Sequence, residues 1–298
     1  MLRIFSLKRQ TPAEAAFGIF NGLLMLIICF LTLYPIWYVL VNSFNDGQDA
    51  MRGGIYWWPR ELSLENFRAV FRSEGIMTAM GITVAKTLLG TAVHVFFTAM
   101  IAYAVSRREL IGRNLYMIIG TITMFFGGGL IPYYLLIRDL GLLDSFLVYI
   151  IPAMFSFFNL IIFLSFFREI PAGLEEAAKI DGAHDLTIFI RVVIPVSMPV
   201  IATIALFHGV YQWNDYFTGM IYINNTDLQP IQTFLYRVVA QSSSNQMLAA
   251  MPSGVTINVT SQSLKLATMV VTTAPIVIVY PFLQKYFVKG FMIGSIKG

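Results

Sequence analysis

The chain has 298 residues, of which 57% are hydrophobic and 12% charged, and its mean hydropathy is +0.71. Soluble domains carry about 25% charged residues, so this composition excludes a soluble protein and indicates an integral membrane protein. The formal net charge of +4 comes from basic residues that flank apolar runs, as in cytoplasmic loops, so no nucleic-acid partner is expected. The single cysteine and three histidines predict neither an intrachain disulfide nor a metal site.

Six apolar runs are long enough to cross a bilayer. The first follows a capping-box pattern, with Thr11 as N-cap, Pro12 at the first helical position and Glu14 three residues after the cap. It is too long for a signal-peptide core and lacks a small-residue cleavage site. We therefore predict one all-α integral membrane domain over residues 1–298, with six transmembrane helices at about 17–41, 76–105, 115–137, 146–167, 192–217 and 266–288.

The positive-inside rule orients these spans. With both termini in the cytoplasm, most of the lysine and arginine residues lie on the cytoplasmic side, although the external loops are longer. The segments outside the bilayer are then external loops at 42–75 and 218–264, a cytoplasmic loop at 173–191 and a cytoplasmic tail at 289–298.

Glycine and proline interrupt two of the predicted spans. Three glycines at 127–129 and Pro132 break the third span, as expected either where backbone lines a cavity or where glycines allow close helix packing. Pro275 and Pro281 are expected to interrupt the sixth span.

Polar residues occur inside the second and fourth spans. Lys86 and His94 are eight residues apart, so they lie about two turns apart on one helix face. The simplest expectation is that Lys86 extends to the membrane surface; pairing with a partner's helix and lining a cavity are the alternatives. Asn159 is expected to form a hydrogen bond between helices.

The fifth span has polar side chains on one helix face. His208, Tyr211, Gln212 and Asp215 are spaced i, i+3, i+4 and i+7. An ionisable residue at the centre of a span costs roughly 2.5–3.5 kcal/mol, so such residues usually face a cavity or a partner. Together with Asn214 these residues are candidates for a path taken by a polar solute. Alternatively, those near the end of the span form a belt at the outer interface.

Residues 174–199 lie between two long apolar runs and are far more polar than either. Glu175 and Glu176 begin a run of helix-forming residues, and acidic residues are favourable in a first turn. Gly182 indicates a helix end or a sharp bend, and an amphipathic segment then leads to Pro195. The pattern predicts two short helices beside the membrane, with a small and apolar face suited to a groove on another protein.

The same stretch carries a resemblance to a known family. Glu-Ala-Ala at 176–178, Gly182 and Val-x-Ile-Pro at 192–195 match in order and spacing the EAA loop of permease subunits from binding-protein-dependent ABC importers. Asp-Gly-Ala at 181–183 resembles the carbohydrate branch, of which the G-type subunit of the maltose importer is a familiar member. The wider stretch 123–237 is similar to permeases for complex oligosaccharides, including alginate- and pectin-derived ones.

The resemblance implies a type I ABC importer permease fold with a cytoplasmic coupling helix, in a bacterial cytoplasmic (inner) membrane. It implies a transporter subunit and no enzyme, with no cofactor on this chain, because ATP and Mg belong to partner ATPase subunits. The implied partners are a second homologous permease, two ATPase subunits, an extracytoplasmic solute-binding protein, the lipid bilayer and a carbohydrate, in particular an oligosaccharide.

The resemblance also assigns residues to contacts with the ATPase. The tail residues Gly294, Lys297 and Gly298 would reach the ATPase interface. The residues that would couple the chain to the ATPase are Glu175, Glu176, Ala177, Ala178, Asp181, Gly182, Ala183 and Pro195.

Two other classes of protein remain as alternatives. An ion-coupled secondary transporter of small polar solutes would show paired ionisable residues within spans and internal repeats, and neither is clear in the sequence. An intramembrane enzyme would need a Ser/Lys, Asp/Asp or His/Glu set inside the spans, and lone residues such as His208 and Asp215 do not form one. The sequence also lacks the GxxxxGK[ST] pattern, so no P-loop is expected.

Overall fold

The computed structural model describes residues 11–73, 75–107, 109–240 and 259–294. In these ranges the regular structure is helical, apart from one isolated bridge between Asn45 and Leu62. The chain divides into two compact units. One consists of Met1–Arg72 and Ser244–Val270, and the other of Ser73–Ser243 and Val271–Gly298.

The first unit begins with α1 (Pro12–Ser43), whose N-terminus confirms the predicted capping box. The Glu14 N–H donates to the Thr11 hydroxyl at 3.3 Å, and the Thr11 N–H donates to the Glu14 carboxylate at 2.8 Å. These two bonds satisfy backbone donors that the first turn of a helix leaves unpaired. Most side chains along α1 are apolar and exposed.

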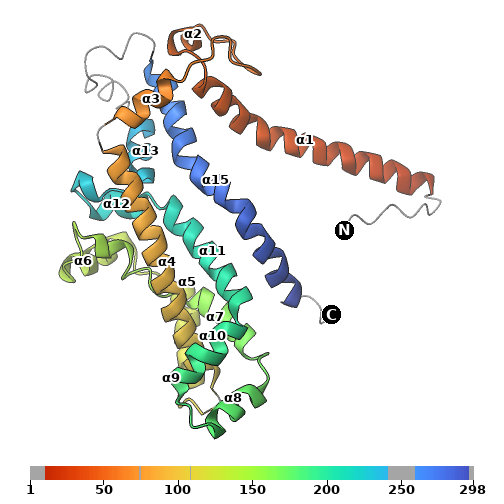
Figure 1. Ribbon diagram of the computed structural model, residues 1–298, viewed down its shortest axis with the longest axis vertical. Helices are drawn as coiled ribbons and strands as arrows, with labels where there is room; N and C mark the ends of the chain where they lie inside the picture. Colours follow the sequence, from red (N-terminus) through yellow and green to blue (C-terminus); the bar gives the residue numbers. More distant parts are fainter. Residues whose placement is uncertain (1–10, 74, 108, 241–258, 295–298) are drawn as a thin grey trace. The chain divides into compact units, whose positions relative to one another are not determined.

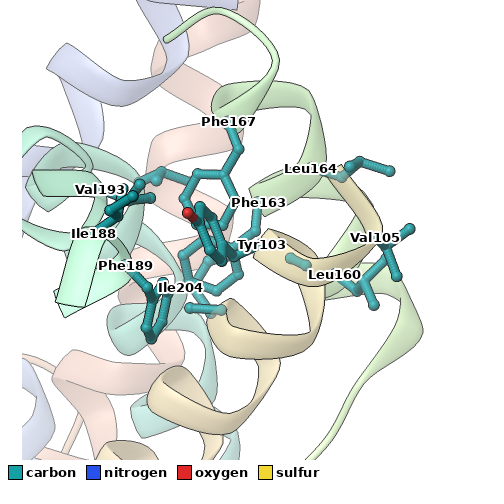
Figure 2. Close-up of a cluster of buried hydrophobic side chains, with 13 residues drawn as sticks. Tyr103, Val105, Leu160, Phe163, Leu164, Phe167, Ile188, Phe189, Val193 and Ile204 are labelled. Atoms are coloured by element: carbon teal, nitrogen blue, oxygen red, sulfur yellow. The ribbon is translucent and has the colours of Figure 1, made fainter. Parts of the chain in front are cut away.

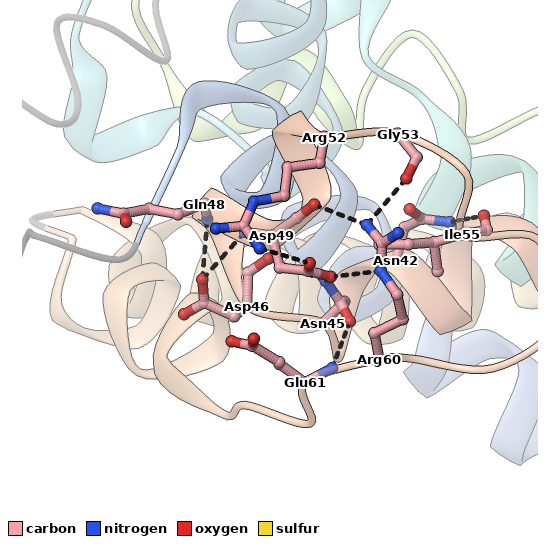
Figure 3. Close-up of polar contacts among 10 residues, drawn as sticks. All are labelled: Asn42, Asn45, Asp46, Gln48, Asp49, Arg52, Gly53, Ile55, Arg60 and Glu61. Atoms are coloured by element: carbon pink, nitrogen blue, oxygen red, sulfur yellow. Dashed lines mark hydrogen bonds and ion pairs between the residues drawn. The ribbon is translucent and has the colours of Figure 1, made fainter.

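A polar network organises the segment after α1, which contains α2 (Gly47–Met51) and α3 (Glu65–Arg72). Both Asn45 Nδ2 and Arg60 Nε donate to Asp49 Oδ2 at 2.9 Å, as Figure 3 shows. The Asn45 hydrogen bond and the Arg60 charge hold the pKa of the Asp49 carboxyl below its usual value. The stretch predicted as an external loop is therefore folded and internally bonded.

The second unit is built around α4 (Ile76–Ser106), which packs along α11 and α7. In Figure 1, α8 and α9 lie at one end of α4, and α12 and α13 lie at the other. The remaining elements are α5 (Arg113–Phe125), α6 (Leu130–Asp139), η1 (Phe146–Tyr149), α7 (Phe157–Phe167), α8 (Ala172–Ile180), α9 (Asp185–Ile188), η2 (Phe189–Val193), α10 (Ile194–Val196), α11 (Met198–Asn214), α12 (Phe217–Tyr222), η3 (Thr226–Leu228) and α13 (Ile231–Ala240).

Helix α15 (Ser261–Gly294) begins in the first unit and continues in the second. It is helical through Pro275 and Pro281, so the predicted interruptions are wrong. A proline removes one backbone hydrogen bond, and a long apolar helix can absorb that loss as a local adjustment. The helix also extends six residues past Val288, to Gly294, while Lys297 and Gly298 lie outside the described residues.

Three helices in the described ranges are long and apolar enough to cross a membrane: Pro12–Ser43, Ile76–Ser106 and Ser261–Val279. Three bent pairs raise the number to as many as six, if each pair forms one span. The bends are 117° between α5 and α6, 81° between α7 and α8, and 84° between Asp185–Val196 and α11.

The glycine break in the third predicted span is present between α5 and α6. A Cβ added at Gly127 or Gly129 would meet no atom within 4 Å. No described part of this chain packs closely on Gly127 or Gly129, and Gly129 lines a cavity that is described below. Of the two explanations left open by the sequence, the geometry supports the cavity.

The stretch predicted as the fourth span is divided in the structure. The short helix η1 ends at Tyr149, a turn follows, and α7 begins at Phe157. Pro152 lies in the turn, and Ser156 caps α7 by accepting a hydrogen bond from the Asn159 N–H at 3.4 Å. The turn leaves backbone carbonyl groups available to side chains from neighbouring helices.

The main hydrophobic core of the second unit lies where α4, α7 and the segment after α9 meet (Figure 2). Tyr103, Phe163 and Phe189 are buried there, and the Tyr103 and Phe189 ring centroids are 5.3 Å apart. The polar 173–191 loop is thus attached to the long helices through its buried end at Ile188 and Phe189.

Candidate functional site

The loop at 173–191 folds as two short helices joined at Gly182, as predicted. The Gly182 N–H donates to the Lys179 carbonyl, and the Ala183 N–H donates to the Ala178 carbonyl, both at 3.0 Å. These two bonds and a φ of 80° at Gly182 define a Schellman motif, in which the residue after the C-cap is left-handed. A Cβ at Gly182 would meet no atom within 4 Å, so backbone angle, and not space, requires glycine there.

The loop has an exposed apolar surface. The side chains of Leu174, Ile180 and Leu186 are 44%, 85% and 58% exposed. Ala178 and Ala183 are only partly exposed and pack against the hydrophobic core. An apolar face held on a packed backbone is the arrangement by which a helix docks into a groove of another protein.

The two glutamates at the start of α8 have different surroundings. Glu175 forms an ion pair with Arg107 at the end of α4, and the Arg107 guanidinium also lies 4.0 Å from the centroid of the Tyr103 ring. Glu176 is exposed. The sequence analysis assigned both residues to ATPase contacts. In the structure, Glu175 holds α8 on α4, whereas Glu176 is accessible.

The other assigned loop residues are also accessible. Ala177 and Asp181 are exposed, and Asp181 is the C-cap of α8. Pro195 is exposed in α10, beside the bend that leads into α11. A charged hollow of about 720 Å³ adjoins the loop, and its lining includes Arg107, Arg113, Arg168, Glu175, Glu176 and Lys179.

A second feature is a pocket of about 330 Å³ at the opposite end of α11. Its walls come from α6, the η1 turn, the end of α11 and α12. Tyrosine rings and a few polar groups dominate the lining, which is the composition expected of a pocket that orients a polar ligand. The lining residues are Gly129, Leu130, Tyr133, Ile137, Val148, Tyr149, Pro152, Ala153, Tyr211, Gln212, Asp215, Phe217, Thr218 and Tyr222.

The pocket contains three of the five residues predicted for a solute path. Tyr211, Gln212 and Asp215 line it. His208 is buried beneath it, one turn before Gln212. Asn214 is exposed, and its side chain donates to the carbonyl of Val210 on its own helix at 2.9 Å.

A chain of polar contacts runs under the pocket. The His94 and His208 rings stack with centroids 3.7 Å apart and planes 8° apart. His94 lies between the Ala153 carbonyl at 2.6 Å and the Asn159 amide nitrogen at 2.8 Å. These partners specify a neutral ring that donates from Nδ1 and accepts at Nε2. The predicted interhelical hydrogen bond of Asn159 is therefore confirmed.

Gln212 connects this chain to the pocket. Its Nε2 donates to the Tyr149 carbonyl at 2.8 Å and lies 3.3 Å from His208 Nε2. It also faces Gly90 of α4, where an added Cβ would lie 2.9 Å from Nε2. The glycine lets α4 and α11 approach at this level.

Lys86 does not extend to the surface, and that expectation is wrong. The side chain is 0% exposed, and its Nζ contacts Asp215 twice, at 2.9 Å from the backbone oxygen and 3.2 Å from Oδ2. The ammonium also lies 4.8 Å from the centroid of the Tyr149 ring. Lys86 thus pairs with a carboxylate that is 129 residues away in the chain.

An aspartate outside the helices connects the turn after α6 to the segment after α12. Asp144, in the turn after α6, accepts hydrogen bonds from the backbone N–H groups of Asn224 and Asn225. These bonds hold the pKa of the Asp144 carboxyl below its usual value, with the Asn225 N–H making the larger contribution.

Sequence reasoning missed three contributors to these sites: Tyr149, the Ala153 carbonyl and Arg107. Pro152 and Ser156 are the sequence features that could have predicted the turn that exposes the Ala153 carbonyl. Within the described ranges, no group of three or more His, Cys, Asp or Glu side chains is placed to hold a metal ion.

Comparison with known proteins gives consistent matches over almost the whole chain. Residues 4–293 match the family described as "Binding-protein-dependent transport system inner membrane component". The polygalacturonan/rhamnogalacturonan transport system permease protein YtcP of Bacillus subtilis is 42% identical over 92% of this chain and 96% of its own length. Protein LplC of the same organism is 39% identical over 97% of both chains.

A solved structure shows the same fold. It is a chain from the crystal structure of a bacterial ABC transporter involved in the import of the acidic polysaccharide alginate. The match has a TM-score of 0.86 and 31% identity, and covers 94% of this chain and 99% of the other.

Proposed function

The chain belongs to the family of binding-protein-dependent transport system inner membrane components, and from this premise we propose that it is a permease subunit of an ATP-driven carbohydrate importer. The substrate is an oligosaccharide, since relatives similar over nearly their whole length are named for glycan transport. The proposed partners are a second permease, two ATPase subunits and an extracytoplasmic solute-binding protein, in a bacterial cytoplasmic membrane with both termini of this chain inside.

The observation that carries the proposal is the loop around Gly182. Its apolar face is exposed at Ile180 and Leu186, while its backbone is fixed by the Schellman motif and by the Glu175–Arg107 ion pair. In the proposed mechanism this face docks in a groove of the ATPase, and closure of the ATPase dimer moves it. Because α8 is held on α4, the movement reaches a helix whose Lys86 contacts Asp215 in the pocket lining.

The pocket beside Tyr211, Gln212 and Asp215 is the proposed contact with sugar on this chain. Carbohydrate rings present hydroxyl groups and apolar C–H faces, and the pocket offers hydrogen-bonding groups and tyrosine rings for both. The glycine break between α5 and α6 supplies part of its wall.

An ion-coupled transporter is the second candidate, because the Lys86–Asp215 pair is a buried ionisable pair of the kind that such proteins use. Uptake of labelled oligosaccharide into vesicles that hold the complete complex separates the two. We expect uptake to require ATP hydrolysis and to survive an ionophore. Uptake that an ionophore abolishes and ATP does not restore would contradict the proposal.

A further inference from the structure

The charges around the pocket determine which class of sugar fits it, and this inference rests on the proposed function. Among the described residues that line the pocket, Asp215 is the one acidic side chain, and no lysine or arginine is present. The tyrosines there contribute neutral hydroxyl groups. The charge of the pocket therefore depends on how completely Asp215 is neutralised.

Lys86 neutralises Asp215 from behind the pocket wall. Its Nζ lies 3.2 Å from Asp215 Oδ2, while the Thr218 N–H donates to the other carboxylate oxygen at 3.1 Å. Because Lys86 is fully buried and is not part of the lining, its charge balances the carboxylate without being presented to a ligand. Two opposite unit charges at this separation leave a dipole in place of a net charge.

This arrangement disfavours an acidic sugar. A uronate carboxylate in the pocket would lie near Asp215 and would find no cation among the described lining residues, whereas its negative charge would have to leave water. The hydroxyl groups of an uncharged sugar can donate to Asp215, and its ring face can lie on a tyrosine such as Tyr211.

We propose that Lys86 is a positioning residue for Asp215, and that the neutralised pocket accepts uncharged, hydroxyl-bearing sugar rings in preference to uronate rings. Lys86 contacts no ligand in this account. It acts by fixing the carboxylate and cancelling its charge.

The charge of the pocket can be measured with thiol reagents in the full complex. Tyr211 is exposed on the pocket wall, so Tyr211→Cys in a Cys29→Ser background presents one thiol of this chain there. Cationic and anionic methanethiosulfonates of similar size then report the local potential as a ratio of reaction rates. Leu140→Cys, exposed and outside the lining, is the control.

With the pair intact, we expect the ratio at position 211 to lie within about threefold of the control ratio, since a single unit charge about 6 Å away would shift it about tenfold even in water. Lys86→Met should shift the ratio about tenfold toward the cationic reagent, and Asp215→Asn toward the anionic one. The double variant should return to the original ratio. A ratio that neither single variant changes, or that is already skewed tenfold, would overturn the proposal.

The sugar preference is tested with trigalacturonate and its carboxyl-reduced counterpart, which differ only at C6, where a neutral hydroxymethyl group replaces each carboxylate. The reduced trimer should protect the thiol at position 211 at a lower concentration than trigalacturonate does. Equal or better protection by trigalacturonate, or uptake of either trimer without protection, would overturn the inference. A complex that hydrolyses ATP and carries no solute would instead contradict the proposed function.

Discussion

The two ends of the α4–α11 helix pair are stabilised in opposite ways. The hydrogen bonds that form the bend at Gly182 are local, between residues three to five apart, and the nearby apolar side chains of Ile180 and Leu186 are exposed. Around Lys86 and His94 the polar side chains are buried and find partners 59 to 129 residues away. The first region has a surface that another protein can complete, whereas the second is completed within the chain. The region around Gly182 therefore suits a docking element, and the region around Lys86 and His94 suits the interior that this element would move.

The largest expected effect is at the buried pair. Lys86→Met leaves the Asp215 carboxylate without its cation, and breaking a buried pair on one side costs about 3–5 kcal/mol. We expect the lower end of that range, because Asp215 also borders the pocket. Thermal unfolding of the purified complex, monitored by size-exclusion chromatography after heating, should show a lower Tm.

The double variant Lys86→Met/Asp215→Asn is the control for that change, because it removes both charges. It should recover most of the lost stability. If the double variant is as unstable as the single one, the pair contributes through packing and not through charge.

Gly182 should give the next largest effect, and on coupling more than on stability. A residue with a side chain costs about 1–2 kcal/mol to hold in the left-handed backbone conformation that Gly182 adopts. Gly182→Leu should therefore distort the Schellman motif and reduce ATP-driven uptake about tenfold. Gly182→Asn is the matched variant, because asparagine tolerates this conformation. Uptake rates normalised to complex yield distinguish the two, and equal rates would contradict a role for the bend.

A smaller effect is expected where α4 meets Gln212. Gly90→Ala would bring a Cβ within 2.9 Å of Gln212 Nε2, so the amide must move from the Tyr149 carbonyl. Alanine favours a helix by about 1 kcal/mol over glycine, which offsets the crowding in the stability. We therefore expect uptake to fall severalfold while Tm changes little. Gly81→Ala is the control on the same helix. A Cβ at Gly81 would meet no atom within 4 Å, so this variant should leave uptake unchanged.

The smallest effect concerns pH at Asp144. Its pKa in the folded protein is lowered by backbone hydrogen bonds, so its contribution to stability is complete above the unfolded pKa of about 3.9 and is lost as pH falls through the lower folded value. Hydrogen exchange of the peptide with Asn224 and Asn225 should therefore speed up at acidic pH after correction for intrinsic rates. Asp144→Ala should remove that dependence.

The loop could be predicted from the sequence because its structure is local. Gly182 ends α8 where the helix-forming run stops, and the same rules predicted Thr11 and Glu14 at the start of α1. The polar interior could be predicted only in part. The spacing of Lys86 and His94 places both on one face of α4. The neighbouring sequence does not indicate which residues of other helices contact that face.

Two errors have the same physical origin. Lys86 was expected at the surface because a lone charge in a helix has no partner in its own neighbourhood of the sequence, and its partner Asp215 is on another helix. The turn after Tyr149 lies within a run of apolar residues, and hydropathy does not distinguish such a turn from a helix.

A photo-crosslinking amino acid at position 180 tests the central proposal most directly. Ile180 is 85% exposed at the end of α8, on the face proposed to dock into the ATPase. In membranes that hold the complete complex, the residue should crosslink to the ATPase subunit, and the same amino acid at the exposed position Phe126, in the break between α5 and α6, should not. Crosslinks from position 180 to lipid alone, in a chain that purifies without any ATPase, would contradict the proposal.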